Sequence, residues 1–372
     1  MTQLKKLTAI VPALCAGILF SGSALSATEG ESLKVEELVS GLQNPWGMTF
    51  LPDKSVLITE RSGAIRRFSA GKGLGEPLKN VPDVVANNQG GMLDIIADPE
   101  YASNNTLYFC YSRPGEGGSS SSVAKAVLAG TALESVETLF VANPLVDNGF
   151  HFGCRLAFDK SGSLLITLGD RYKFMDEAQN TSNHLGKIVR INKDGSVPQD
   201  NPFAQGKAPE VYSYGHRNVQ GLTIHPDTQQ VWAMEHGPKG GDEVNLIKKG
   251  ANYGWPEITY GIDYSGDIIS DRTEMDGMEQ PVIYWDPSIA PSGMAFYTGS
   301  VFKDWQGDLL VGALKFKHLR RIEMDNGKPG EQFEYLKDRE ERIRDVEIGP
   351  DGFIYVLTDD TNGKLLKLSP TE

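Results

Sequence analysis

The side chains best suited to chemistry are concentrated in three neighbouring stretches, VYSYGHRNVQG, EHGPKGGDEVN and NYGWP. They combine histidines, an Arg-Asn pair and several acids with glycines that let a ligand approach the backbone closely. Carboxylates and backbone carbonyls are the ligands that calcium prefers. The carbonyls of Gly237 and Pro238 and the carboxylate of Glu243 are therefore candidate calcium ligands. The alternative is that these acids are ordinary solvated turn residues.

A separate histidine, His151, lies between glycines in the stretch GFHFGCRLAF, just before a predicted strand. The glycines leave room for a substrate beside the ring. A neutral imidazole can act as a general base near pH 7. His151 is thus a candidate catalytic base, and the alternative is a structural histidine that fills the edge of a sheet.

Cationic side chains gather near the C-terminus in the stretches LKFKHLRR and RIRDVEIGPDG. Arg342 and Arg344 alternate along a predicted strand, so both should point to the same face. Guanidinium groups bind carboxylates in a bidentate manner, so this pair, with Lys315 and Arg217, could hold a polyanionic small molecule. The alternative is pairing with the nearby acids Asp338, Glu340, Glu341 and Asp345.

The elements that must position these residues are short strands. Turn residues lead into a β-branched or aromatic run at six places along the chain: 52–60, 104–112, 160–170, 226–237, 305–314 and 350–359. Several are followed by a further turn and strand, and their spacing is close to that of propeller blades. The pattern predicts an all-β fold, a six-bladed β-propeller of four-stranded antiparallel blades, whose loops on one face carry the function. Two β-sandwiches are the alternative.

Composition narrows the classes of function. The 372 residues include 41 Gly and 20 Pro and carry a formal net charge of −13. Such an acidic chain repels phosphate backbones and anionic lipid surfaces, so nucleic acid is not an expected partner. CxxC, HExxH, GxGxxG, Walker and nucleophile-elbow motifs are absent from the sequence, which argues against zinc, NAD, FAD and ATP.

The first 27 residues have a basic start, an apolar stretch and a run of small residues, which predicts a cleaved secretory signal peptide. Residues 28–372 then form the catalytic domain. The expected location is periplasmic or secreted, without stable membrane insertion; a retained anchor is the alternative. Two cysteines remain in the mature chain, Cys110 and Cys154. The sequence is compatible both with a disulfide between these cysteines and with two buried free thiols.

Nine ordered segments give the chain a resemblance to a known family: GLQNPWGMTFLPD, NQGGMLDIIADP, HFGCRLAF, SLLITLGDR, YGHRNVQGL, EHGPKGGDEVN, NYGWP, APSGMAFYTG and RIRDVEIGPDG. The chain resembles the soluble, pyrroloquinoline quinone (PQQ)-dependent aldose sugar dehydrogenases of the glucose/sorbosone dehydrogenase family over almost the whole mature sequence. The resemblance implies a six-bladed propeller with PQQ in a groove on one face.

The resemblance also implies roles for individual residues. His151 would take the proton of the anomeric hydroxyl while hydride passes to PQQ, with Arg217 beside it as a second catalytic group. The implied PQQ contacts are His151, Gln89, Arg217, Asn218, Tyr264, Lys315, Arg342 and Arg344. The Gly237 and Pro238 carbonyls would bind the calcium ion that contacts PQQ. Glu243 and the carbonyl of Tyr253 resemble a second, structural calcium site.

We therefore expect an enzyme that oxidises aldose sugars to lactones and passes electrons to an external acceptor, which could be a quinone, a cytochrome or a dye. The glucose-oxidising branch of the family has an acid where this chain has Phe150, which places the chain nearer the broader aldose sugar dehydrogenase branch. A calcium-dependent lactonase and a catalytically silent binding propeller are the alternatives. The preferred sugar, the physiological acceptor and the oligomeric state do not follow from the sequence.

Overall fold

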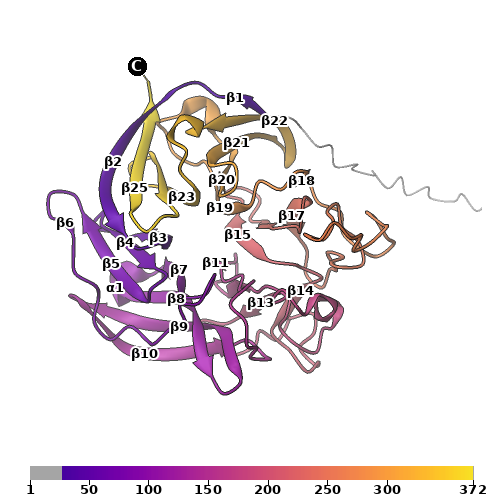
Figure 1. Ribbon diagram of the computed structural model, residues 1–372. Helices are drawn as coiled ribbons and strands as arrows, with labels where there is room; N and C mark the ends of the chain where they lie inside the picture. Colours follow the sequence, from indigo (N-terminus) through magenta and orange to yellow (C-terminus); the bar gives the residue numbers. More distant parts are fainter. Residues whose placement is uncertain (1–26, 372) are drawn as a thin grey trace, which may run out of the picture.

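The computed structural model describes residues 27–371, whose strands form a ring of six small sheets (Figure 1). This confirms the predicted six-bladed β-propeller. The predicted signal peptide, 1–27, lies outside the described residues apart from Ala27. The helices are short: α1 (Tyr101–Asn104), η1 (Met175–Gln179), η2 (Lys303–Trp305) and η3 (Lys337–Arg339). Among residues 27–371, no helix is long and apolar enough to cross a membrane.

The first three blades follow one another along the chain, each an antiparallel sheet of four consecutive strands. The first blade comprises β3 (Pro45–Phe50), β4 (Val56–Glu60), β5 (Ala64–Ser69) and β6 (Gly73–Leu74). The second comprises β7 (Met92–Ala97), β8 (Thr106–Gly115), β9 (Gly118–Ala129) and β10 (Ala132–Val141). The third comprises β11 (Leu156–Phe158), β12 (Leu164–Thr167), β13 (Lys187–Ile191) and β14 (Val211–Tyr214).

The last three blades continue the same order around the ring. The fourth comprises β15 (Val219–Ile224), β16 (Val231–Glu235), β17 (Asp242–Ile247) and β18 (Ile283–Trp285). The fifth comprises β19 (Pro291–Phe296), β20 (Leu309–Ala313), β21 (His318–Asp325) and β22 (Lys328–Tyr335). The sixth comprises β23 (Ile343–Ile348), β24 (Ile354–Thr358), β25 (Gly363–Pro370) and, from the other end of the chain, β2 (Leu33–Leu42).

Two N-terminal strands depart from the simple repeat. β2 pairs antiparallel with β25, so the ring is closed by strands from the two ends of the described chain (Figure 1). β1 (Ala27–Glu29) pairs parallel with β22 and gives the fifth blade a fifth strand. The expected four-stranded antiparallel pattern therefore holds in five blades and is extended in one.

The first strand of each blade lies innermost. β3, β7, β11, β15, β19 and β23 contact one another in that order and close a ring around the central axis. Each starts at the same end of the axis, because the blades repeat the same chain direction. The antiparallel second strand of each blade ends there. The segments that precede the inner strands and those that follow the second strands therefore meet at one face.

The six turn-and-strand signals in the sequence correspond to the second strands β4, β8, β12, β16, β20 and β24. Five of these strands are buried along their whole length. Neighbouring blades cover both faces of such a strand, so its sequence is a continuous apolar run rather than an alternating one. The turn-and-strand signal that repeats in the sequence thus identifies the second strands, which are the most buried strands of the fold.

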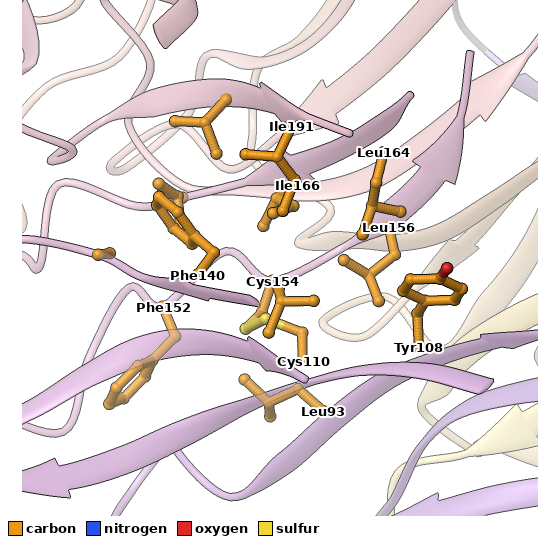
Figure 2. Packing of buried hydrophobic residues seen from close by; sticks show 14 of the residues in the cluster. Leu93, Tyr108, Cys110, Phe140, Phe152, Cys154, Leu156, Leu164, Ile166 and Ile191 are labelled. Atoms are coloured by element: carbon orange, nitrogen blue, oxygen red, sulfur yellow. A yellow bond between two sulfur atoms is a disulfide. The ribbon is translucent and has the colours of Figure 1, made fainter. Parts of the chain in front are cut away.

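The hydrophobic core consists of clusters packed between adjacent blades. Figure 2 shows the cluster between the second and third blades, where Leu93 and Phe140 pack near Leu156 and Ile166. A disulfide between Cys110 and Cys154 runs through it, which settles the pairing that the sequence left open. This bond joins β8 to the segment just before β11. A crosslink over 44 positions is worth roughly 2–4 kcal/mol in constraint of the unfolded chain.

Candidate functional site

A cavity of about 400 Å³ opens at the face where the inner strands begin. Its lining combines residues at the starts of inner strands with residues that follow second strands, including Trp46, Arg61, Gln89, Asn218, Arg344 and Asp359. The residues come from most of the blades, so the propeller ring itself assembles the site. This accounts for candidate residues that are spread from 89 to 344 in the sequence.

His151 lies beside this cavity, in the loop that leads into β11, and its side chain is buried. Its Nδ1 atom is 2.7 Å from the Oδ1 atom of Asp170. The other carboxylate oxygen of Asp170 accepts a hydrogen bond from the indole Nε1 of Trp255 at 2.8 Å. Gly169 must lack a side chain, since a Cβ there would lie 2.2 Å from the His151 carbonyl oxygen. The imidazole is therefore held by a buried, fixed carboxylate.

The electrostatics of the pair favour a neutral imidazole next to an ionised acid. Burial, and then the positive charge of Arg217, lower the pKa of His151 below its ordinary value. Burial acts against ionisation of Asp170, but its hydrogen bond with His151 and nearby positive charges leave the pKa of that carboxyl lowered. With Asp170 accepting at Nδ1, Nε2 is the nitrogen left to accept a proton.

Two polar side chains fix the backbone around His151. The Oε1 atom of Gln89 accepts a hydrogen bond from the His151 amide at 2.8 Å. The Oδ1 atom of Asn218 accepts one from the Gly153 amide at 3.2 Å. Gln89 and Asn218 also line the cavity. Both predicted cofactor contacts thus lie at the site and position the histidine loop.

Arg217 is buried and precedes β15. Its Nη1 atom donates to the carbonyl of Gly237 at 2.8 Å and to that of His236 at 3.2 Å. Its guanidinium carbon lies 5.3 Å from the ring centre of Trp255 and 5.9 Å from that of Tyr264. The ring of Tyr264 is largely exposed. Arg217 therefore connects the predicted calcium segment with the residues around His151.

The cationic wall of the cavity is built around an acid that sequence reasoning missed. Arg342 and Arg344 both bind the Oδ2 atom of Asp359, at 2.9 and 3.2 Å, so the two guanidinium groups converge on one acid, although only Arg344 lies on β23 and Arg342 directly precedes that strand. Two of the four alternative partners are engaged elsewhere, Glu341 with Lys364 and Asp345 with Arg155.

This wall keeps unused hydrogen-bonding capacity. The buried Nε atoms of Arg344 and Arg61 have no hydrogen-bond partner among the described residues, although both arginines line the cavity. Burial opposes ionisation of Asp359, yet Arg344 and Arg342 lower its pKa below the ordinary value. Lys315 is exposed in the loop after β20, next to the lining residue Leu314. Guanidinium groups in excess of carboxylates make this wall suited to an anionic ligand.

A second, smaller cavity adjoins Arg217 and is lined by Gly237, Glu243 and Tyr253, three of the four predicted calcium-binding residues. Burial, and then repulsion from Glu235, raise the pKa of Glu243 to about 8. Pro238 follows Gly237 but is not part of this lining. Within residues 27–371, no three His, Cys, Asp or Glu side chains converge as a metal-ligand set, so any cation here would depend on backbone carbonyls.

Three further residues of the site escaped sequence reasoning: Asp170, Asp359 and Arg61. Arg61 and Asp359 directly follow the second strands β4 and β24 and line the cavity, and Asp170 lies in the segment that follows the second strand β12. Asp170 and Asp359 are the last residues of two of the six repeated signals, 160–170 and 350–359. The segments that follow the second strands were therefore the signal by which sequence reasoning could have found them.

Comparison with known proteins agrees with this geometry. The family model for Glucose / Sorbosone dehydrogenase matches residues 42–367. Aldose sugar dehydrogenase YliI of Escherichia coli is 43% identical over 97% of this chain and 98% of its own. Quinoprotein glucose dehydrogenase B of Acinetobacter calcoaceticus is 27% identical over 95% of this chain and 90% of its own.

Solved structures give the same result. The soluble aldose sugar dehydrogenase of Escherichia coli in its apo form aligns with a TM-score of 0.89 and 43% identity, over 91% of this chain and all of that one. The PQQ-bound aldose sugar dehydrogenase of Streptomyces coelicolor aligns with a TM-score of 0.76 and 29% identity, over 92% and 99% of the two chains. These matches confirm the prediction of a sugar-acting oxidoreductase, and the chain belongs to the glucose/sorbosone dehydrogenase family.

Proposed function

We propose that this protein oxidises the anomeric hydroxyl of aldose sugars to the lactone, using PQQ and calcium, and passes the electrons to an external acceptor such as a quinone, a cytochrome or a dye. The observation that carries the proposal is the pair of unpartnered guanidinium Nε atoms, on Arg344 and Arg61, in a cavity beside the buried His151–Asp170 pair. The proposed location is the periplasm or the medium, after removal of a signal peptide.

The cavity fits PQQ by charge and hydrogen bonding. PQQ carries three carboxylates, which require several cationic donors inside an acidic protein. Arg61 and Arg344 offer unpaired donors, Arg342 has a side chain that is 43% exposed, and Lys315 is exposed near the rim. Gln89 and Asn218 add amide groups. When bound, PQQ supplies a two-electron acceptor for the hydride that leaves the anomeric carbon.

Calcium is supported by the donor chemistry of the smaller cavity. The carboxyl of Glu243 lies in a wall that also contains Glu235, and the resulting repulsion is what a divalent cation relieves. Carbonyl oxygens from Gly237, Pro238 and Tyr253 would complete an oxygen-only ligand set of the kind calcium prefers. A cation beside PQQ would act as a Lewis acid.

The protein's own part in the reaction is proton transfer and positioning. The hydroxyl proton passes to the Nε2 atom of His151, because Nδ1 is engaged by Asp170. The carboxylate of Asp170 stabilises the imidazolium that forms. Gln89 and Asn218 hold the histidine loop by its amides, so the base is preorganised before the sugar binds.

Reconstitution tests this proposal. Metal-free protein incubated with PQQ, Ca²⁺, an aldose and an artificial dye should reduce the dye, and omission of PQQ should abolish the signal. Arg344→Gln should weaken PQQ binding by roughly 10- to 100-fold, because hydrogen bonds to charged groups are lost. Quenching of intrinsic fluorescence measures the affinity. Hydrolysis of a lactone without dye reduction would instead indicate a calcium-dependent lactonase.

The pH dependence of the rate should follow His151. The imidazole is active as a base only when it is neutral, and its pKa is lowered by burial and by Arg217. Activity should therefore persist as the pH falls below about 6.5, the ordinary value for histidine, and decline only at more acidic pH. The acidic limb of kcat/KM against pH measures this. An acidic limb above pH 7 would contradict the assignment.

A further inference from the structure

Two aromatic side chains stand exposed beside the histidine of the site. Phe150 and Tyr172 keep 38% and 44% of their surface accessible. Their ring centres are 5.6 Å apart, and the ring of Tyr172 lies edge-on to the imidazole of His151 at 5.3 Å. The pair is therefore a partly apolar surface next to the reacting group.

The backbone under Tyr172 is held in an unfavourable conformation. Arg171 and Tyr172 have φ values of 57° and 66°, in the left-handed region that residues with a Cβ seldom adopt. The amide of Tyr172 donates to the Oδ1 atom of Asp170 at 2.7 Å. That same oxygen binds His151. One carboxylate thus fixes both the base and the aromatic ring beside it, and such backbone outliers are typical of functional sites.

Arg171 fixes the other half of the pair. Its buried guanidinium donates to the carbonyls of Phe150 at 2.9 Å, Asn148 at 2.6 Å and Ser119 at 2.8 Å. It also lies 3.9 Å above the ring of Phe152. The loop that carries Phe150 and His151 is therefore tied to the loop that carries Tyr172. The backbone segments that carry both rings are therefore fixed relative to the base.

We propose that Phe150 and Tyr172 form one wall of the sugar site and contact the apolar C–H face of the pyranose ring whose anomeric hydroxyl reaches His151. This inference rests on the proposed oxidation of aldoses and adds a specificity-determining surface to it. When the anomeric hydroxyl approaches the Nε2 atom of His151, the pyranose ring that carries it lies next to the imidazole. The exposed rings of Phe150 and Tyr172 form the protein surface beside that position. Aromatic rings offer an apolar face to C–H groups, and the Tyr172 hydroxyl can bond a sugar hydroxyl. The favoured substrates are pyranoses with an unbroken C–H face.

Steady-state kinetics of matched variants test the wall. Tyr172→Ala should raise KM for D-glucose about tenfold, the effect of one lost aromatic contact, with kcat changed less than about twofold. Tyr172→Phe keeps the ring and should stay within about threefold of the parent. Phe174→Ala is the control, because Phe174 is similarly exposed at 37% in the same loop, without a ring contact to His151 among the described residues. The acidic limb of the pH profile should not move in any of them.

A binding measurement separates this inference from the oxidation itself. Saturation-transfer NMR on cofactor-free protein, with irradiation of aromatic protons, should give signals on the C–H protons of D-glucose in the parent and in Tyr172→Phe. In Tyr172→Ala, whose affinity for the sugar should fall about tenfold, the signals at the same sugar concentration should be strongly reduced. If the parent fails to reduce dye yet still shows this transfer, the oxidation is wrong and the sugar wall stands. Equal transfer in the parent and Tyr172→Ala, or a raised KM for the dye alone, overturns the wall.

Discussion

His151→Gln is expected to lower the turnover number for an aldose by about 10²- to 10⁴-fold, the range that a positioned general base contributes. Glutamine fills a similar space but cannot accept the hydroxyl proton. The carboxylate of Asp170, 2.7 Å from Nδ1, then has no imidazolium to stabilise. The cationic wall formed by Arg342 and Arg344 is untouched by the change, so PQQ should still bind.

The experiment combines dye reduction at saturating sugar with PQQ affinity from fluorescence quenching. His225→Gln is the matched control, because His225 lies in the hairpin between β15 and β16, at the end of those strands remote from Arg217 and Asn218. It should turn over like the parent. Turnover of His151→Gln within tenfold of the parent would remove the base assignment.

Arg155→Met should reduce the free energy of unfolding by about 3–5 kcal/mol, the usual cost of removing one partner from a buried ion pair. Arg155 is buried and directly precedes β11, and its Nη1 atom lies 2.8 Å from Asp345 on β23 and 3.3 Å from Asp94 on β7. Its Nε atom donates to the carbonyl of Gln220 on β15 at 2.7 Å. One side chain at the start of β11 thus joins the inner strands β7, β15 and β23 across the axis.

Urea unfolding at several pH values measures this loss. Burial raises the pKa of Asp345 to about 7, and burial also raises the pKa of Asp94. Without Arg155 both carboxyls bind protons still more readily in the folded protein than in the unfolded chain. The loss in free energy of unfolding caused by Arg155→Met should therefore be largest near pH 8 and become smaller as the pH falls toward 5. Arg272→Met, which removes an exposed guanidinium, should change stability by less than about 1 kcal/mol. A stability loss of Arg155→Met that does not change with pH would contradict the role of the ion pairs with Asp345 and Asp94.

The fold could be predicted because its most buried strands have sequence patterns that are easy to recognise as strands. Each second strand is covered on both sides by neighbouring blades, so it appears as an apolar run entered through a tight turn, as at 52–60 and 350–359. The inner strand β11 has only three residues, Leu156–Phe158, and gives no such signal. Counting the blades was therefore easier than finding their inner strands.

The site was predicted in part, for a related reason. His151, Arg217 and Arg344 are conspicuous because glycines or alternating charges surround them. Asp170 and Asp359 lie at the ends of apolar runs, where they look like ordinary turn residues. Their roles depend on contacts with groups 19 and 15 residues away, across strand ends that only the assembled ring brings together.

The Arg155 network was out of reach of sequence reasoning. Its contacts join Arg155 to Asp94, 61 residues away, and to the carbonyl of Arg344, 189 residues away. These partners meet only because inner strands converge on one axis, and a local pattern cannot encode that convergence. The disulfide was likewise undecidable, since both cysteines sit in apolar segments that suit a buried thiol equally well.

The pairing of β2 with β25 closes the propeller ring through hydrogen bonds between segments that lie more than 300 positions apart in the sequence. Loop closure on that scale is slow, because the entropy of bringing the ends together is lost before any contact compensates for it. During synthesis the first five blades can emerge from the ribosome and pack against one another. The propeller ring stays open, however, until residues 363–370 have been made. Arg344 lies on β23 and Arg342 directly precedes it, in the blade that the β2–β25 pairing completes, so the anion-binding wall is the last part of the protein to form.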